Sequence, residues 1–243
     1  MLAGILIVLV GLSLSAQSTT QSFSDSFHNT TLDRTHWVIG KINAQGDATP
    51  TQDGLQLTLT PRNLSTYFAL DVWLNCRIRG DFDAQVSYRL VDWPNQSGIR
   101  LGLGVHPNPL PLGRTSLLGL AGTNAVGLRT AISERISLKP QAVTIYPNGG
   151  EFYAAELNGR QGQLYITPNR SGKLRITRIQ NDFTAWYWDQ GGNMWLPAGR
   201  WSVTSQVKDD EWIALQLWGR NDSPNITVKV ENFSVSAQTL SCP

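Results

Sequence analysis

Residues 173–195 read KLRITRIQNDFTAWYWDQGGNMW, and this stretch decides the fold class. Apolar and polar side chains alternate on both sides of an Asn181-Asp182 step. A side-chain period of two on either side of a turn dipeptide is typical of a β-hairpin. A second turn, DQGGN, precedes Trp195. The stretch therefore predicts antiparallel β structure that carries aromatic rings on its second strand.

Short alternating runs of the same kind recur along the chain. Gly, Pro, Asn and Asp separate them, and helical periodicity is too short to predict a helix. This pattern is typical of an all-β sandwich. Strands are expected at 21–27, 54–60, 66–78, 81–91, 98–106, 115–121, 125–137, 141–146, 151–157, 163–167, 172–180, 183–189, 211–219 and 225–237. No linker or internal repeat divides them, so one domain over residues 17–243 is predicted.

The faces of the clearest strands can be separated by their pattern. Core-facing side chains are predicted to be Phe82, Ala84, Val86, Tyr88, Leu90, Ile99, Leu101, Leu103, Val105, Leu174, Ile176, Phe183, Ala185, Tyr187, Ile213, Leu215 and Leu217. A slip of one residue would turn each apolar set to solvent, so the pattern specifies the register strongly.

The first residues predict export. Leu2–Leu12 is apolar and is followed by small residues, which indicates a signal peptide over residues 1–16. The run is shorter than the roughly 20 residues of a membrane span, so an uncleaved anchor is the weaker alternative. A secreted, extracellular or periplasmic protein is expected. No later segment predicts a membrane span.

Charge and cysteine content limit the partners. The 243 residues carry a net charge of +2 and no run of Lys or Arg, so nucleic-acid binding has no electrostatic basis. Cys76 and Cys242 are expected to form a disulfide, as a lone cysteine pair usually does in an exported protein. Two cysteines and three histidines without ligand spacing do not predict a zinc site.

Seven sequons for N-linked glycosylation occur along the chain, at Asn29, Asn63, Asn95, Asn169, Asn221, Asn225 and Asn232. In a eukaryotic host several would carry glycans and make the chain a glycoprotein. A chain rich in Asn, Ser and Thr also produces such triplets by chance. Both interpretations stay open.

Five segments, in order, resemble the concanavalin A-like jelly-roll domains of lectins and glucanases. They are FSDSF with LD and Trp37 at 23–37, GLQL at 54–57, GDFDAQV at 80–86, the hairpin at 173–195, and VENFSV at 230–235. The resemblance implies two stacked antiparallel sheets, with ligands bound on or beside a concave face. It does not imply one activity, because this fold hosts lectins, carbohydrate-binding modules, hydrolases and lyases.

The sequence gives little support for catalysis. Retaining glycosidases need two carboxyl groups about 5–5.5 Å apart. The resembling laminarinases supply them as Glu-x-Asp-x-x-Glu or Glu-x-Asp-x-Glu on one strand, and this chain has neither motif. Asp81 and Asp83, two apart on one strand face, are the nearest weak catalytic candidates. A glycosidase or polysaccharide lyase is therefore an alternative, not the leading hypothesis.

Carbohydrate binding needs only an aromatic platform and a few polar groups that orient hydroxyls. Outward positions of the predicted strands offer both, and the candidate ligand-binding residues are Trp212, Gln216, Trp218, Trp186, Trp188 and Arg100. The two groups of tryptophans would form one surface if their strands were neighbours. The structural alternative is that loops cover these rings and keep them from a ligand.

The resemblance also raises a structural calcium ion that joins the first and last strands, with Asp25 and Glu231 as candidate ligands. Calcium takes six to eight oxygen ligands, and no spaced ligand loop is visible. The leading hypothesis is a secreted lectin-like protein that holds a glycan or glycoconjugate on the concave sheet. A non-catalytic adhesion or structural module is the third possibility. The oligomeric state does not follow from the sequence.

Overall fold

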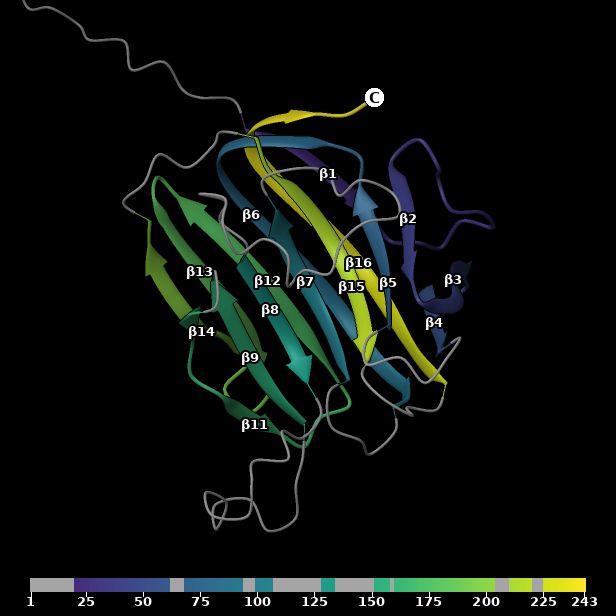
Figure 1. The fold of residues 1–243 in the computed structure, drawn as a ribbon. Helices are drawn as coiled ribbons and strands as arrows, with labels where there is room; N and C mark the ends of the chain where they lie inside the picture. Colours follow the sequence, from purple (N-terminus) through teal and green to yellow (C-terminus); the bar gives the residue numbers. More distant parts are fainter. Residues whose placement is uncertain are drawn as a thin grey trace, which may run out of the picture.

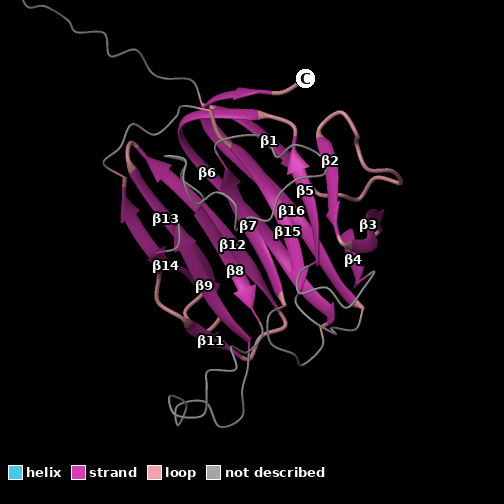
Figure 2. Cartoon of the chain, in the orientation of Figure 1, coloured by secondary structure: helices cyan, strands magenta, loops and turns pink. Residues whose placement is uncertain are grey.

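The computed structural model describes residues 20–61, 68–93, 99–106, 128–133, 151–157, 160–203, 210–219 and 225–243. Their regular structure is β-strand throughout, joined by turns and loops (Figure 2). The strands form two antiparallel sheets of eight strands each, which stack face to face (Figure 1). The fold is thus the two-sheet, all-β sandwich that the sequence predicts.

Sheet A has the strand order β14-β13-β12-β6-β16-β4-β3, and β1 also pairs with β16. The bounds are β1 Gln21–Asp25, β3 Ala44–Thr51, β4 Gly54–Pro61, β6 Arg77–Asp92, β12 Ser171–Ile179, β13 Asp182–Asp189, β14 Met194–Ser202 and β16 Ile226–Ser241. β6 and β16 are the two longest strands and pair along most of their length. They form the centre of the sheet.

Sheet B has the strand order β10-β9-β8-β7-β15-β5-β2, and β11 also pairs with β9. The bounds are β2 Trp37–Ile42, β5 Phe68–Leu74, β7 Arg100–His106, β8 Leu128–Ser133, β9 Glu151–Leu157, β10 Arg160–Gln161, β11 Tyr165–Thr167 and β15 Trp212–Gly219. Consecutive strands such as β12 and β13 share a sheet, whereas β15 and β16 lie in different sheets. The chain therefore crosses repeatedly between the two layers.

One hydrophobic core fills the space between the sheets. Every core-facing side chain predicted from the alternating pattern is buried there. Leu174, Ile176, Phe183 and Ala185 of the hairpin have no exposed surface. Each buried leucine or phenylalanine removes enough apolar surface from water to contribute about 1.5–3 kcal/mol. The alternation is confirmed because only one register places all of these side chains inside.

Some strand predictions need correction. The turn of the hairpin is Gln180-Asn181, with Gln180 at φ 55°, and Asp182 already pairs with Ile179. β2, β3, β10 and β14 were not expected from the sequence, and the strand expected at 66–78 is divided between β5 and the start of β6. Polar residues on both faces of β3 hide the alternation there. The strands predicted at 115–121 and 141–146, and the signal peptide at 1–16, lie outside the described residues.

Cys76 and Cys242 form the predicted disulfide, across a sequence separation of 166 residues. Arg77 pairs with Ser241 in the β6–β16 ladder, so the disulfide occupies the next position of the same ladder. It ties the end of β16 to the start of β6. Among the described residues, no helix has the length and apolar character to cross a bilayer.

A buried ion pair joins the two sheets at one end. Arg178 Nη1 lies 3.3 Å from Glu211 Oε1, and their side chains are 7% and 2% exposed. The backbone of Glu211 exchanges two hydrogen bonds of 2.9 Å with Ile78. β12 of sheet A is therefore connected through Glu211 to the beginning of β15 in sheet B.

Removing the disulfide is expected to destabilise the fold without changing it. The Cys76→Ser/Cys242→Ser double variant should lose up to about 4–5 kcal/mol of unfolding free energy, because the unfolded chain regains the entropy of a long open loop. Urea unfolding followed by tryptophan fluorescence measures this loss. Wild-type protein in reductant serves as the control and should show the same shift. An unchanged midpoint in both would contradict the stabilising role.

Candidate functional site

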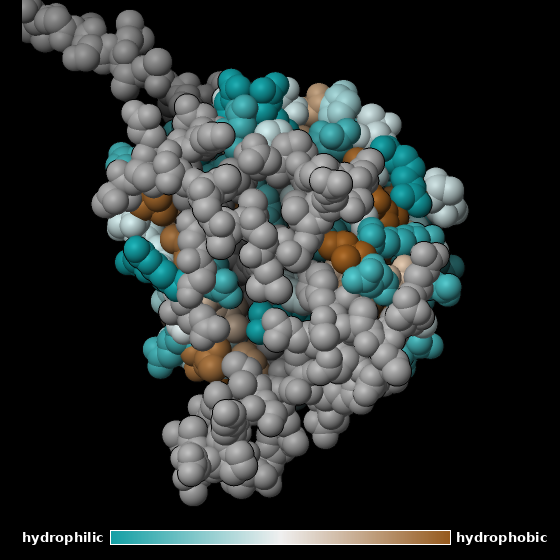
Figure 3. Space-filling model, in the orientation of Figure 1, coloured by the Kyte–Doolittle hydropathy of each residue, from teal (hydrophilic) through white to brown (hydrophobic). Residues whose placement is uncertain are grey.

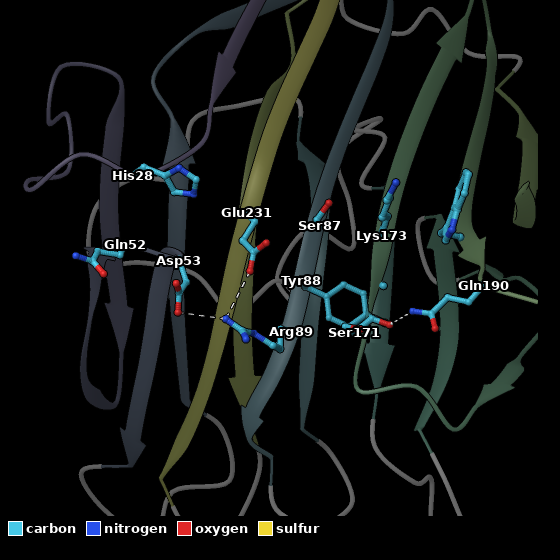
Figure 4. Close-up of a pocket in the computed structure, with 12 residues that line it drawn as sticks. His28, Gln52, Asp53, Ser87, Tyr88, Arg89, Ser171, Lys173, Gln190 and Glu231 are labelled. Atoms are coloured by element: carbon cyan, nitrogen blue, oxygen red, sulfur yellow. Dashed lines mark hydrogen bonds and ion pairs between the residues drawn. The ribbon is translucent and has the colours of Figure 1, made fainter. Parts of the chain in front are cut away.

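An open groove of about 650 Å³ crosses the outer face of sheet A, the face that points away from the core. It is called the sheet-A groove below. Its charged and aromatic lining residues include Asp53, Arg89, Lys173, Trp188 and Glu231. They come from the β3–β4 turn, β6, β12, β13 and β16. Figure 4 shows that Asp53 and Glu231 point toward Arg89, and that Gln190 points toward Ser171.

Strand register places these residues side by side. Glu231 of β16 is opposite Ser87 of β6, and Ser87 is opposite Lys173 of β12. The Lys173 Nζ atom lies 4.4 Å from the ring centroid of Trp188 on β13. Outward side chains of paired strands share a face, so the ladder produces a continuous row from a carboxylate to an indole.

Arg89 stands at the centre of the charges in the groove. Its Nη2 atom is 3.6 Å from Asp53 Oδ2 and 3.8 Å from Glu231 Oε1. Lys229 Nζ also donates a hydrogen bond of 2.8 Å to Asp53 Oδ2. The hydrogen bond from Lys229, with its charge and that of Arg89, lowers the pKa of Asp53 below its ordinary value of 3.8. Asp53 is therefore ionised at neutral pH and acts as an acceptor.

Backbone features hold the Glu231 carboxylate against the β3–β4 turn. Gly54 has φ +107°, and a Cβ there would lie 2.7 Å from Glu231 Cγ and 2.5 Å from the Val230 carbonyl oxygen. The ladder between β16 and β6 shifts register between Glu231 and Ser234, with Asn232 at φ 51°. Such a β-bulge redirects side chains next to it. The bulge and the glycine together set where the carboxylate points.

A cluster of tryptophans borders the groove. Trp188 and Trp195 meet edge to face with ring centroids 5.3 Å apart. Trp186 donates a hydrogen bond of 2.9 Å from Nε1 to Thr177 Oγ1. The Arg175 guanidinium lies 5.7 Å from the Trp186 ring and 5.6 Å from the Trp195 ring. Trp186 and Trp188 are half-buried on the outer face, as the sequence predicts.

The weak catalytic candidates have other contacts. Arg175 donates to Asp83 in a bidentate arrangement, with Nε to Oδ1 at 2.8 Å. Asp81 Oδ1 accepts a hydrogen bond of 2.5 Å from the backbone of Gln180, the turn residue with positive φ. These contacts let Asp83 position Arg175 beneath the tryptophans and let Asp81 stabilise the hairpin turn.

The other predicted binding residues lie on the opposite sheet. Trp212, Gln216 and Trp218 share the outer face of β15, but Gln216 has no exposed surface and Trp218 is 5% exposed. Gln216 Nε2 donates to Asp71 Oδ1 at 3.2 Å. Trp212 and Arg100 are half-buried at the two ends of the β15–β7 ladder. Since β13 and β15 lie in different sheets, the two tryptophan groups do not form one surface.

The expected calcium ligands already have nitrogen partners. Asp25 Oδ1 accepts from the Phe27 backbone at 2.7 Å, and its Oδ2 accepts from Trp37 Nε1 at 2.8 Å. Glu231 faces Arg89. In the part of the chain that the structure describes, no group of three or more His, Cys, Asp or Glu side chains could hold an ion. Both carboxylates are thus engaged by nitrogen donors of the protein.

Several groove residues were not among the predicted binding residues: His28, Gln52, Asp53, Arg89, Lys173 and Gln190. Ser87 and Arg89 are on the outward face that the alternation already predicts. The available signal was charge, because outward positions of β6, β12 and β16 carry Arg89, Lys173 and Glu231. Their pairing depends on which strands are neighbours, which the pattern of one strand cannot show.

Comparison with solved structures assigns the fold. The chain is similar to lectin I from Ulex europaeus, solved with the methyl glycoside of α-L-fucose, at 13% identity and a TM-score of 0.61 over 90% of this chain and 98% of that one. It is also similar to the basic lectin of winged bean, solved with Tn-antigen, at 10% identity and a TM-score of 0.60 over 93% and 100%. The architecture is therefore the concanavalin A-like jelly roll, a lectin-like fold.

The remaining comparisons indicate no activity. A protein of unknown function with a galectin-like fold from Bacillus subtilis matches at 8% identity and a TM-score of 0.56, over 89% of this chain and 96% of that one. The family described as "Protein of unknown function (DUF1583) C domain" matches residues 7–106. The comparison with curated proteins found no match.

The depressed pKa of Asp53 can be tested by carboxyl-carbon NMR. Asp53 should titrate below 3.8, so its ion pairs stabilise the fold above the unfolded pKa and are lost as the pH falls through the folded pKa. The Lys229→Met variant should raise this pKa toward 3.8, because the principal hydrogen bond is removed. Asp33 is the internal control, since its pKa is lowered by His36 and should not move. Titration of wild-type Asp53 at 3.8 would refute the assignment.

Proposed function

We propose that this protein is a secreted, lectin-like carbohydrate-binding protein that holds a glycan in the sheet-A groove. One observation supports this proposal: a single exposed groove contains an indole ring beside several planar polar groups. An indole face packs against the apolar face of a pyranose, while carboxylates, amides and guanidinium groups bind its hydroxyls. Trp188, Asp53 and Arg89 provide these three chemistries.

The groove also has the size and order that such a ligand requires. Its volume of about 650 Å³ lies within the roughly 300–1,000 Å³ of typical small-molecule sites. Arg89 Nη2 lies within 4 Å of Asp53 and of Glu231, and the hydrogen bond from Lys229 orders the Asp53 carboxylate before a ligand arrives. Side chains that are already ordered lose less entropy on binding. The groove thus supports binding better than the buried outer face of β15 does.

Export is part of the same proposal. The Cys76–Cys242 disulfide suits an oxidising compartment, because cytosolic reductants keep most thiols reduced. The apolar residues after Met1 suit a signal peptide. Where Figure 3 shows described residues, hydrophilic side chains surround separate apolar patches.

Replacing the indole tests the binding site. The Trp188→Ala variant should lose at least about 2 kcal/mol of binding free energy, roughly thirtyfold in Kd, toward any glycan that the native protein retains on an array. The matched control is Trp212→Ala, a half-buried tryptophan on the other sheet, which should bind as the native protein does. Unfolding midpoints establish that both variants fold. Loss of binding in Trp212→Ala alone would move the site to sheet B.

Hydrolysis is a second candidate, favoured by one observation. Asp53 and Glu231 both lie within 4 Å of the same Arg89 nitrogen atom. Carboxyl groups that flank one glycosidic bond are separated by roughly 5–9.5 Å, a range that such a pair can satisfy. The low pKa of Asp53 suits a nucleophile or base and not the general acid. Glu231 would therefore have to be the acid.

Release of new reducing ends from polysaccharides separates hydrolysis from binding. If the groove is hydrolytic, Glu231→Gln should lower the rate by at least about a hundredfold, the usual contribution of a general acid. Asp83→Asn is the matched control and should keep its rate, because Asp83 is engaged by Arg175. Glycan binding without any new reducing ends in the native protein would exclude the hydrolytic alternative for that glycan.

A further inference from the structure

A second depression adjoins the sheet-A groove. It has a volume of about 280 Å³ and lies between β11 and the end of β13. Tyr165, Ile166 and Asn169 are among its lining residues. Trp188 and Gln190 line both the groove and this second depression. The two spaces therefore meet at a ridge formed by Trp188 and Gln190.

The ridge between the two spaces is held in place. Gln190 Nε2 donates a hydrogen bond of 2.8 Å to the Ser171 carbonyl oxygen, which ties the turn after β13 to the start of β12 (Figure 4). Asp189 Oδ2 accepts from the backbone of Gly192 at 2.9 Å, and its Oδ1 from Gly191 at 3.3 Å. A carboxylate that caps its own turn fixes the turn conformation. The path over Gln190 is thus preformed.

The second depression has an aromatic wall with a rigid support. Tyr153 and Tyr187 stack with centroids 4.5 Å apart, and Tyr165 lies 4.9 Å from Tyr187. Tyr153 and Tyr187 are 2% and 7% exposed, whereas Tyr165 is half-exposed at the end of the stack. Tyr165 also donates a hydrogen bond of 3.0 Å to Gln163 Oε1. A supported ring of this kind binds a flat apolar surface at low entropic cost.

The size of the second depression indicates how it would be used. A volume of about 280 Å³ falls just below the roughly 300 Å³ at which independent small-molecule sites begin. It is more suitable as an extension of the neighbouring groove than as a separate site. Two aromatic rings, Trp188 and Tyr165, then lie along one path, and polar side chains line both spaces.

We propose that the ligand is an extended oligosaccharide that occupies both spaces and passes over Trp188 and Gln190. This inference rests on the proposed glycan binding and specifies its class: a stretch of a polysaccharide chain, not a single terminal sugar. Contacts in the second depression become available only when the chain is long enough to reach Tyr165. Affinity therefore rises with chain length up to the length that fills both spaces.

The experiment is calorimetric titration of the full chain, produced in a bacterial host so that Asn169 carries no glycan. The probes are the monosaccharide to hexasaccharide series of β-1,3-glucan, β-1,4-glucan, xylan, mannan, galactan and chitin. For the series that binds, the longest members should bind at least about tenfold more tightly than the monosaccharide, equivalent to about 1.4 kcal/mol. Equal affinity across the series would overturn the inference and leave the proposed function intact.

Three variants locate the source of the length dependence. Ile166→Arg, at a position 47% exposed in the second depression, should abolish the gain with length and leave short members within about twofold of native affinity. Ile179→Arg is the matched control: it adds the same charge at a 65% exposed isoleucine at the far end of β12 and should behave as the native protein. Trp188→Ala should weaken every member.

The outcomes are distinguishable. If no member of any series binds, the proposed function fails and the inference fails with it. If binding occurs and Ile166→Arg keeps the full gain with length, the second depression is not part of the site. Tyr165→Phe, which retains the ring but loses the hydroxyl contact to Gln163, should keep the length dependence if stacking is its source.

Discussion

Antiparallel pairing of β6 with β16 is the constraint on which the rest of the structure depends. Each strand has sixteen residues, and together they bring the early part of the chain against its end. β1 and β4 add to β16, while β12 adds to β6 and carries β13 and β14 with it. The Cys76–Cys242 disulfide continues the ladder at its open end. Sheet A exists as one surface because this central pair continues through its bulges along most of both strands.

The same register also positions the side chains of the sheet-A groove. Buried Val86, Tyr88 and Leu90 fix β6, so their outward neighbours Ser87 and Arg89 must face solvent. The matching position on β16 then places Glu231 beside them. A bulge at this point redirects the carboxylate without disturbing the core below it. The same strand pairing therefore sets both the core packing and the groove geometry, and a register error would destroy both.

The alternation of apolar and polar residues can be read from the sequence of one strand, but the identity of its neighbouring strands cannot. The core sides of the hairpin and of β6, β7 and β15 followed from local pattern, because a period of two reports which residues share a face. Strand β3 gave no such signal, since most of its side chains are polar. The outward side of β15 was correctly identified as sharing Trp212, Gln216 and Trp218. That Gln216 and Trp218 are buried there could not be foreseen, because burial depends on residues distant in sequence.

The sequence by itself determined the all-β class, the core-facing residues, the likeness to concanavalin A-like domains and the pairing of Cys76 with Cys242. Each depends on local period, turn residues or a cysteine count. Only the tertiary structure decided that Trp188 lies beside an open groove, and that Asp53, Arg89 and Glu231 meet there. The reason is physical: a site on a sheet is assembled across strands, and strand order is set by long-range packing of the whole core.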